Sequence, residues 1–287
     1  MNDISVFAQT DVGKVRKGNE DSFLVVDTTS EHSDSLPEVR QYNLNEGNQF
    51  FMVADGMGGP AAGEVASLLA VNTVLKEMTS KTASEESEFV RILDDFLQKA
   101  NIAIIEEALS HPEMRGMGTT ATLAGTLNNK LFVGQVGDSR AYIIRMDKIT
   151  QITKDQSLVN QLVESGTISE EEAENHPQKN VILQALGNKK SLQVASTSVE
   201  LCRDDYLLLC SDGLSGLVKN EEMKNIIQSS TDLPTASKKL IDLTNQRGGH
   251  DNITLVISHF TGEAFSPPSK NKAVVCEIIS EFKPQLS

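Results

Sequence analysis

Leu207-Leu-Leu-Cys-Ser-Asp-Gly213 is a short apolar run that ends in an aspartate and a glycine. The same pattern occurs in Phe50-Phe-Met-Val-Ala-Asp-Gly56, and Leu131-Phe-Val-Gly-Gln-Val-Gly-Asp138 also brings an aspartate to the end of an apolar run. Such runs, bounded by turn residues, are typical of buried strands. Each Asp-Gly taken singly is better interpreted as a turn, because Asp bonds its own backbone and Gly accepts positive φ. Taken together, the three runs predict a sheet that carries acids at the ends of its strands.

Two more acidic positions flank apolar segments. Glu20-Asp21 leads directly into 22–26, and Asp251 stands at the start of the segment 252–260. Carboxylates crowded at one edge of a sheet repel one another unless cations neutralise them, and oxygen-only ligands suit Mg²⁺ or Mn²⁺. Apart from His250, no histidine or cysteine stands among these acids, so zinc is disfavoured.

The acids predict metal-assisted phosphate hydrolysis as a reaction class. An oxygen-rich site that holds two divalent ions can bridge a water molecule, lower its pKa and clamp a phosphoryl oxygen. Arg16, four residues before Glu20, has the guanidinium fork that binds phosphate through two hydrogen bonds. On its own, Arg16 is better interpreted as a surface arginine.

Composition limits the partners. The chain has 287 residues, of which 39% are hydrophobic and 23% charged, with a net charge of −14. This is ordinary globular composition, and so acidic a surface repels nucleic acid and anionic membranes. No basic segment followed by an apolar core opens the chain, and no apolar stretch approaches the length of a membrane span. The three cysteines form no disulfide or zinc pattern. A cytoplasmic protein without nucleic-acid or membrane partners is expected.

Periodicity predicts an α+β protein. Strands are expected at 22–27, 49–54, 120–127, 130–136, 141–145, 192–200, 205–210 and 252–260, and helices at 61–78, 84–109, 157–165, 170–175, 220–227 and 233–246. Asn128-Asn129 predicts a hairpin turn, and Ser169 with Glu172 predicts a capping box. Because the strands cluster, layered α+β packing is favoured over a parallel βαβ sheet. A long exposed loop is expected at 28–48 and a short amphipathic tail helix at 273–282.

Seven segments, in order, resemble the motifs of the metal-dependent serine/threonine protein phosphatases called the PPM or type 2C family, and most closely its compact bacterial members. The segments are Arg16-Lys-Gly-Asn-Glu-Asp21, Val53-Ala-Asp-Gly-Met-Gly-Gly59, Gly118-Thr-Thr120, Val136-Gly-Asp-Ser-Arg-Ala-Tyr142, Asp155-Gln-Ser157, Leu208-Leu-Cys-Ser-Asp-Gly-Leu214 and Gly249-His-Asp-Asn-Ile-Thr254. Any one of them alone is a weak signal. The ordered set covers roughly residues 1–262.

The resemblance implies a fold and a metal centre. The expected fold is a central antiparallel β-sandwich flanked by helix pairs, in α-β-β-α layers, over 1–262, with 263–287 as a C-terminal tail. The expected cofactors are two core Mn²⁺ or Mg²⁺ ions, with a third ion as in bacterial relatives. The implied metal-binding residues are Glu20, Asp21 through water, Asp55, the Gly56 carbonyl, Asp138, Asp212 and Asp251. Among them, Asp55 would bridge the two core ions, and Asp138 with Asp212 would hold the third.

By the same resemblance, Asp55, Asp212 and Arg16 are the expected catalytic residues, with Arg16 gripping the substrate phosphate. A metal-bridged hydroxide would attack phosphorus directly, without a covalent phosphoenzyme. Eukaryotic members have a histidine general acid where this chain has Met57. His176, in the region 157–180 that matches the family's mobile flap, is a candidate general acid, beside a purely structural interpretation.

The expected substrates are Ser/Thr-phosphorylated proteins, with a cognate Ser/Thr kinase and its targets as natural partners, and a monomer is expected. Three alternative functions differ from this one in what they require of the sequence. A pseudophosphatase that serves as a binding module would lack at least one acid, and none is missing. A phosphatase of small phosphate esters stays open, because a metal centre does not sense what lies beyond the phosphate. A structural calcium-binding protein would not need the ordered motifs or Arg16.

Overall fold

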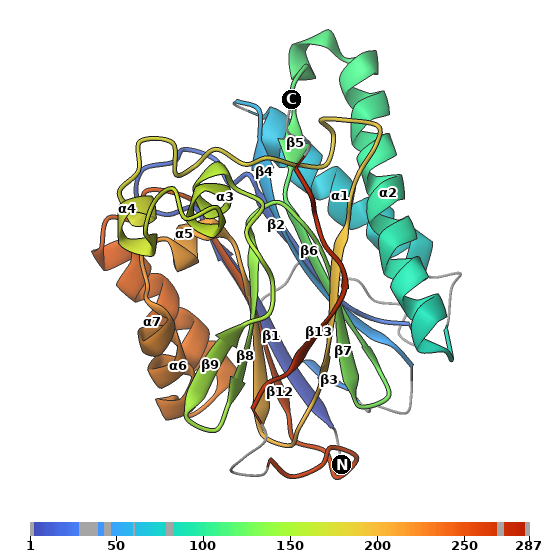
Figure 1. Ribbon diagram of the computed structural model, residues 1–287, viewed down its shortest axis with the longest axis vertical. Coiled ribbons are helices and arrows are strands. Elements are labelled where there is room, and N and C mark those ends of the chain that lie inside the picture. The colour runs from blue at the N-terminus through green and yellow to red at the C-terminus, as the bar shows by residue number, and fades with distance from the viewer. Residues whose placement is uncertain are drawn as a thin grey trace.

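The computed structural model describes residues 3–28, 40–42, 47–59, 61–78, 83–268 and 273–284. Two antiparallel sheets pack face to face, and a helix pair covers the outer face of each, which gives α-β-β-α layers (Figure 1). The α+β sandwich inferred from the motifs is therefore confirmed. Within the described part of the chain, no helix is long and apolar enough to cross a membrane.

The first sheet joins the two ends of the domain. Its order is β3-β1-β12-β11-β8-β9, from β3 (Arg40–Tyr42), β1 (Ile4–Asp11), β12 (Ile253–Phe260), β11 (Asp205–Cys210), β8 (Arg140–Arg145) and β9 (Lys148–Gln151). β1 pairs with β12 along its whole length, from Ile4 opposite Phe260 to Asp11 opposite Ile253. Helices α6 (Asn220–Ser229) and α7 (Leu233–Gln246) cover its outer face.

The second sheet carries the other helix pair. Its order is β13-β10-β7-β6-β4-β2, from β13 (Cys276–Ser280), β10 (Ala195–Glu200), β7 (Lys130–Val136), β6 (Ala121–Leu127), β4 (Gln49–Met57) and β2 (Asp21–Asp27), and the short β5 (Gly118–Thr119) pairs with β4. Helices α1 (Ala62–Met78) and α2 (Glu86–Ser110) pack on it. Their contact includes the ring of Phe89, which stacks on Phe50 at 5.5 Å and meets Phe132 at 5.4 Å.

Three apolar cores hold these layers together. One lies between the sheets, and the others lie between each sheet and its helices. The inner strands are buried on both faces, so they read in the sequence as continuous apolar runs instead of alternating patterns. This explains why Leu207-Leu-Leu-Cys210 was recognisable as a strand.

Most predicted elements are confirmed, including both long helices and the 128–129 turn, where Asn128 adopts φ +56° between paired strands. The capping box of Ser169 and Glu172 begins α4 (Glu170–Glu174), which follows α3 (Leu158–Glu164). The 28–48 loop prediction is wrong at β3, while 29–39 and 43–46 lie outside the described residues. The predicted tail helix at 273–282 is also wrong, because β13 forms there and pairs with β10.

Candidate active site

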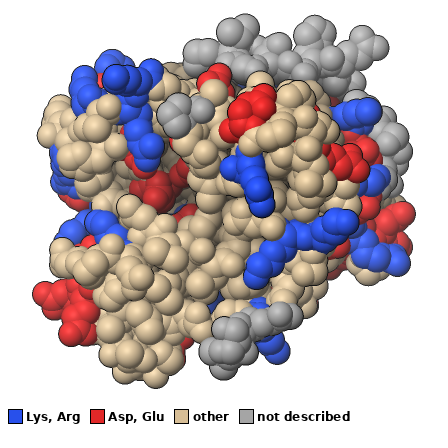
Figure 2. Space-filling model, turned by 90° about the horizontal axis from the view of Figure 1, so that it is seen from above, with Lys and Arg blue, Asp and Glu red and all other residues tan. Residues whose placement is uncertain are grey.

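The acids predicted from strand ends converge at one end of the sandwich. Figure 2 looks at this end and shows acidic side chains inside a hollow whose rim carries lysines and arginines. Asp21, the first residue of β2, lies directly opposite Asp55 of β4 in the register of the sheet. Asp212 follows β11 as the first residue of α5 (Asp212–Ser215), and Asp251 lies just before β12. Two sheets therefore contribute carboxylates to one place.

Asp21 is held by the neighbouring sheet. Its Oδ2 accepts a hydrogen bond from Ser211 Oγ at 2.8 Å, and Ser211 Oγ also accepts the backbone N–H of Thr254. Desolvation raises the pKa of Asp21 to about 7, against the opposing hydrogen bonds from Thr254 and Ser211. A carboxyl with such a raised pKa binds a cation or a proton more readily than an exposed one does.

Asp55 is the centre of the acid cluster. Desolvation, followed by repulsion from Asp21, Asp212, Asp138 and Asp251, raises its pKa well above the usual value. Its backbone is fixed, because its N–H donates to Thr120 Oγ1 at 3.0 Å. Since four other acids repel Asp55, the five carboxyl groups form one electrostatically coupled cluster.

Gly56 follows Asp55 in a place that only glycine fits. A Cβ at Gly56 would stand 2.1 Å from the carbonyl oxygen of Gly63 and 2.5 Å from that of Glu20. The N–H of Gly56 donates to the Glu20 carbonyl at 3.0 Å. The close backbone approach therefore joins the Asp-Gly strand end, the start of α1 and the Glu20 loop.

Arg16 connects two further predicted acids, Glu20 and Asp251. Its Nη2 donates to Asp251 Oδ2 at 2.7 Å, and its Nη1 lies 4.0 Å from Glu20 Oε2. The Arg16 side chain is 46% exposed, so it faces the solvent side of the cluster. The pKa of Glu20 is raised by desolvation, which outweighs the lowering effect of Arg16. Asp251 also repels Asp212, whose pKa is raised mainly by desolvation.

Asp138 lies in the turn between β7 and β8. Desolvation and then repulsion from Asp212 and Asp155 raise its pKa to about 7, against the lowering effect of Arg140. Arg140 itself is engaged by Asp155, with Nε at 3.0 Å from both carboxylate oxygens and Nη2 at 2.7 Å from Oδ2. This bidentate pair ties the Asp138 turn to the segment that follows β9.

Asn252 was missed as a functional residue, although it stands in a quoted motif. Its Oδ1 accepts the Glu20 N–H at 2.8 Å, and its Nδ2 donates to the carbonyls of Val12 and Gly18 at 3.0 Å. It thereby fixes the loop that carries Arg16 and Glu20 against Asp251. Ser211, likewise missed, fixes Asp21. Both roles depend on contacts across about two hundred residues, and the motif positions were the single signal for them.

His176 lies in the turn after α4, where its Nδ1 accepts the backbone N–H of Gln178 at 3.1 Å. One of its ring nitrogens is therefore used to hold the turn, and its role as general acid stays a prediction. Met57, at the position of the eukaryotic histidine, ends β4 opposite Gly118.

The donor set fits a hard divalent cation. The cluster offers carboxylate and carbonyl oxygens and neither thiolate nor imidazole, which is the chemistry of Mg²⁺ and Mn²⁺ sites. Among the described residues, no three His, Cys, Asp or Glu side chains stand in a ready metal-holding geometry. The carboxylates repel one another, so a cation has to draw them together.

The family profile described as protein phosphatase 2C matches residues 38–246. The chain belongs to the protein phosphatase 2C family. The serine/threonine phosphatase stp of Listeria innocua is 38% identical over 252 residues, which are 87% of this chain and 93% of the relative. The resemblance drawn from the seven segments is therefore confirmed.

Solved structures agree. The S. agalactiae serine/threonine phosphatase matches with a TM-score of 0.80 and 30% identity, covering 90% of this chain and all of that one. The catalytic domain of the phosphatase PstP, in complex with two manganese ions, matches with a TM-score of 0.75 and 32% identity. The match covers 91% of this chain and all of that catalytic-domain chain. As a member of the phosphatase 2C family, the chain is a hydrolase and a protein phosphatase that uses divalent metal.

Proposed function

We propose that this phosphatase 2C hydrolyses phosphoserine and phosphothreonine in other proteins, at the acid cluster around Asp55. The observation that carries the proposal is the convergence of Asp21, Asp55 and Asp212 from strands of both sheets, where burial and mutual repulsion raise their pKa values. Such a cluster, in this family's fold, is built to hold cations and through them a phosphate.

The proposed metal-binding residues divide by position. Asp55, Asp212 and Asp251 would hold one ion, and Asp55 and Glu20 would hold a second, with Asp21 acting through water. The Gly56 carbonyl would bind one of these two ions. Asp138 with Asp212 would hold a third ion. Bound Mn²⁺ or Mg²⁺ would supply the positive charge that lowers the pKa of the attacking water and offsets the charge of the phosphate.

The protein's own residues would orient the substrate. Arg16 reaches the solvent side of the cluster and would exchange Asp251 for two oxygens of the phosphate. Asn252 keeps the loop of Arg16 and Glu20 in register with Asp251, and Ser211 keeps Asp21 oriented. Water would then attack phosphorus directly as the bond from phosphorus to the serine or threonine oxygen breaks. The attacking water loses a proton and the leaving oxygen gains one, so that phosphate and a free hydroxyl are released.

The substrates are expected to be Ser/Thr-phosphorylated proteins, including a cognate kinase and its targets. The enzyme itself is expected to be a monomer. The open hollow supports this choice, since a phosphorylated side chain on a protein surface needs an accessible site (Figure 2). The Asp138 and Arg16 positions both lie at this end of the sandwich.

Initial rates with a phosphothreonine peptide and with p-nitrophenyl phosphate, each in EDTA, Mg²⁺ or Mn²⁺, test the proposal. Metal-dependent release of phosphate from the peptide is expected. Release from the small ester alone would contradict the protein substrate, and no release from a folded sample under any metal would contradict the enzymatic function.

The Asp212→Asn variant tests the role of the cluster. It removes one negative ligand, so kcat is expected to fall by about a thousandfold or more while the circular dichroism spectrum is unchanged. Asp147→Asn is the matched control, because Asp147 is an exposed turn residue after β8. An Asp212→Asn rate equal to that of the control would refute the assignment.

A further inference from the structure

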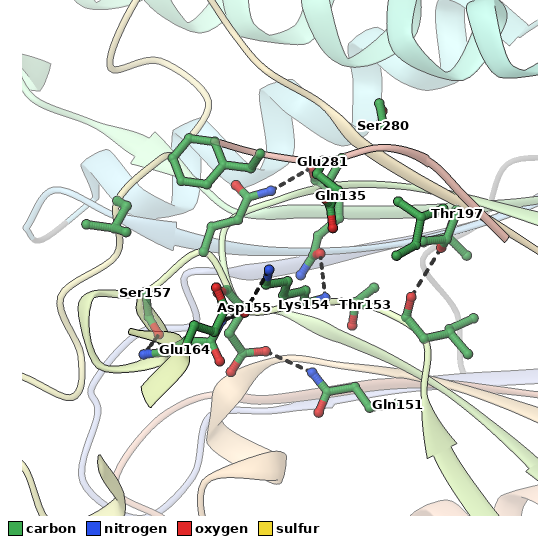
Figure 3. A pocket seen from close by; sticks show the side chains of 18 of the residues that line it. Gln135, Gln151, Thr153, Lys154, Asp155, Ser157, Glu164, Thr197, Ser280 and Glu281 are labelled. Carbon is green, nitrogen blue, oxygen red and sulfur yellow. Dashed lines mark hydrogen bonds and ion pairs between the residues drawn. The ribbon is translucent and has the colours of Figure 1, made fainter. Parts of the chain in front are cut away.

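A cavity of about 230 Å³ lies between the C-terminal segment and the residues 151–157 at and after the end of β9. Figure 3 shows Ser280 and Glu281 of the C-terminal segment on one side of it and Asp155 and Gln151 on the other. Asp155 is the partner of Arg140, so one wall of the cavity is also the support of the proposed metal centre. The C-terminal segment thus closes a space that the described mechanism does not use.

The segment 273–284, here called the strap, is held loosely. Its strand β13 pairs with β10 through four residue pairs, interrupted by a register shift. The side chains of Ile278 and Ile279 are 60% and 42% exposed. At the end of the strand, Ser280 Oγ donates to the Val194 carbonyl at 2.8 Å, and beyond the strand the Lys283 N–H donates to Gln193 Oε1 at 3.1 Å.

Hydrogen bonds lead from the strap to the proposed metal centre through three glutamines. The N–H of Gln193 donates to Gln184 Oε1 at 2.9 Å, and Gln184 Nε2 donates to Gln156 Oε1 at 3.0 Å. The same Gln156 Oε1 accepts the N–H of Gly137 at 2.9 Å. Gly137 directly precedes Asp138, so the chain of contacts ends at the turn that aims this carboxylate.

Gly137 needs this support. Its φ is +94°, and a Cβ there would stand 2.7 Å from the Thr120 side chain, so the turn is tight and tolerates only glycine. Gln156 is buried, and its own backbone N–H donates to the Gly137 carbonyl at 3.1 Å. Two opposed bonds from one buried residue fix the peptide before Asp138.

We propose that the strap is a positioning segment of the catalytic centre: docked on β10, it closes the cavity and secures the glutamine chain that fixes the Gly137–Asp138 turn. This inference rests on the proposed metal-binding role of Asp138. The strap touches neither substrate nor metal, and acts through Gln193, Gln184 and Gln156. Release of the strap frees Gln193 from the Lys283 N–H and opens the cavity, so that water competes for the Gln156 amide, which loosens the turn.

Two variants of the full chain test the proposal at different points. Ile278→Pro breaks the pairing of β13 with β10, and Gln184→Leu keeps the strap but cuts the glutamine chain. Gln178→Leu is the matched control, the same substitution at an exposed position of the same loop region. None of these residues belongs to the proposed metal or substrate site.

The first measurement is amide hydrogen exchange at Gly137 by NMR, in EDTA and without substrate. Exchange about fivefold faster or more is expected in both test variants and not in Gln178→Leu. The double variant is expected to exchange no faster than Gln184→Leu alone, because both changes act on one chain of contacts. Unchanged exchange at Gly137 in Gln184→Leu, or additive effects in the double variant, would overturn the proposal. Should Ile278→Pro fail to fold, Gln184→Leu decides alone.

The second measurement is Mn²⁺ binding, followed by electron paramagnetic resonance of the free ion. The weakest-bound ion is expected to lose affinity about fivefold in both test variants, with the KM for p-nitrophenyl phosphate unchanged. Wild-type Mn²⁺ affinity together with faster Gly137 exchange would separate the strap from the metal centre and refute its positioning role. A wild-type chain without phosphatase activity would refute the proposed function, while the exchange result stands independently of it.

Discussion

At the scale of single residues, Arg16 is paired with an acid of the cluster and is also accessible to a substrate phosphate. It donates to Asp251 at 2.7 Å, yet nearly half of its side chain is exposed, so the guanidinium can exchange that carboxylate for a phosphate. Two charge-assisted hydrogen bonds to a phosphate are each stronger than neutral ones. We therefore expect Arg16 to contribute more to substrate binding than to the chemical step.

Arg16→Ala is expected to raise the KM for a phosphothreonine peptide about tenfold to a hundredfold, with a smaller change in kcat. The reason is that the charge-assisted bonds it removes are made to the bound substrate in its ground state as well as in the transition state. Arg16→Lys, which keeps the charge but loses the fork, is expected to fall between. Steady-state kinetics at fixed Mn²⁺ measure both. With Arg91→Ala on α2 as the control, a KM equal to the control's would remove Arg16 from the phosphate site.

The acids were predictable from sequence, whereas the residues that hold them were not. Asp55, Asp138 and Asp212 are recognisable in the sequence as candidate site residues, because each of them ends an apolar run. The fold brings the ends of these runs together. Asn252 and Ser211 bond to the loop of Glu20 and to Asp21, which are about two hundred residues away in the chain. Local sequence carries no trace of such contacts, so their roles needed the tertiary structure.

At the scale of elements, β8 and β11 are joined by a buried ion pair. Arg145 Nη2 lies 2.7 Å from Asp205 Oδ2, and the two side chains are 4% and 0% exposed. Asp205 Oδ2 also accepts the Cys202 N–H at 2.8 Å, and Arg145 donates to the Glu200 carbonyl. Both charges are therefore fully occupied, which is the condition under which a buried pair is tolerated.

Arg145→Met is expected to lower the free energy of unfolding by about 3–5 kcal/mol, because it leaves the Asp205 carboxylate buried without a partner. Urea unfolding followed by circular dichroism measures the loss. Adding Asp205→Asn to Arg145→Met removes the stranded charge and is expected to recover part of it. A single variant as stable as the wild type would show that the pair contributes nothing to joining the strands.

Elements buried on both faces were predictable, and those defined by their edges were not. The strand 205–210 is a continuous apolar run and the helix 84–109 has clear helical periodicity, and both formed with shifts of one or two residues at most. β13 was predicted as a helix, because its alternation is weak and its large side chains are exposed. Its extended form comes from pairing with β10, which no local pattern encodes. β3, within the predicted loop, depends on β1 in the same way.

At the scale of the whole molecule, the acid cluster makes stability depend on pH and on metal. Asp21 and Asp138 have pKa values raised to about 7, from an ordinary value near 4 in an unfolded chain. The folded protein therefore binds more protons than the unfolded chain between those limits. The contribution of these groups is fully present below pH about 4 and is lost as pH rises through about 7.

In EDTA, the Tm is expected to fall by roughly 5–10 °C between pH 5 and pH 8, and Mn²⁺ is expected to restore it at pH 8, since a cation replaces the protons. Differential scanning calorimetry gives the Tm. Groups with lowered pKa values, such as Glu222 at about 2, change stability only at lower pH and do not interfere. Asp138→Asn should flatten the profile. A Tm in EDTA that stays constant or rises from pH 5 to pH 8 would contradict the expectation.

The pairing of β1 with β12 also determines when the active site can form during translation. β1 can pair only after β12 has been synthesised, and in the register of the sheet Ile4 lies opposite Phe260, more than 250 residues further along the chain. Arg16 and Asp251 meet only when that pairing closes, and Asn252 joins the Glu20 loop at the same moment. Such distant pairing forms late, because the intervening chain must first be ordered. A nascent chain is therefore expected to lack activity until β12 has emerged from the ribosome.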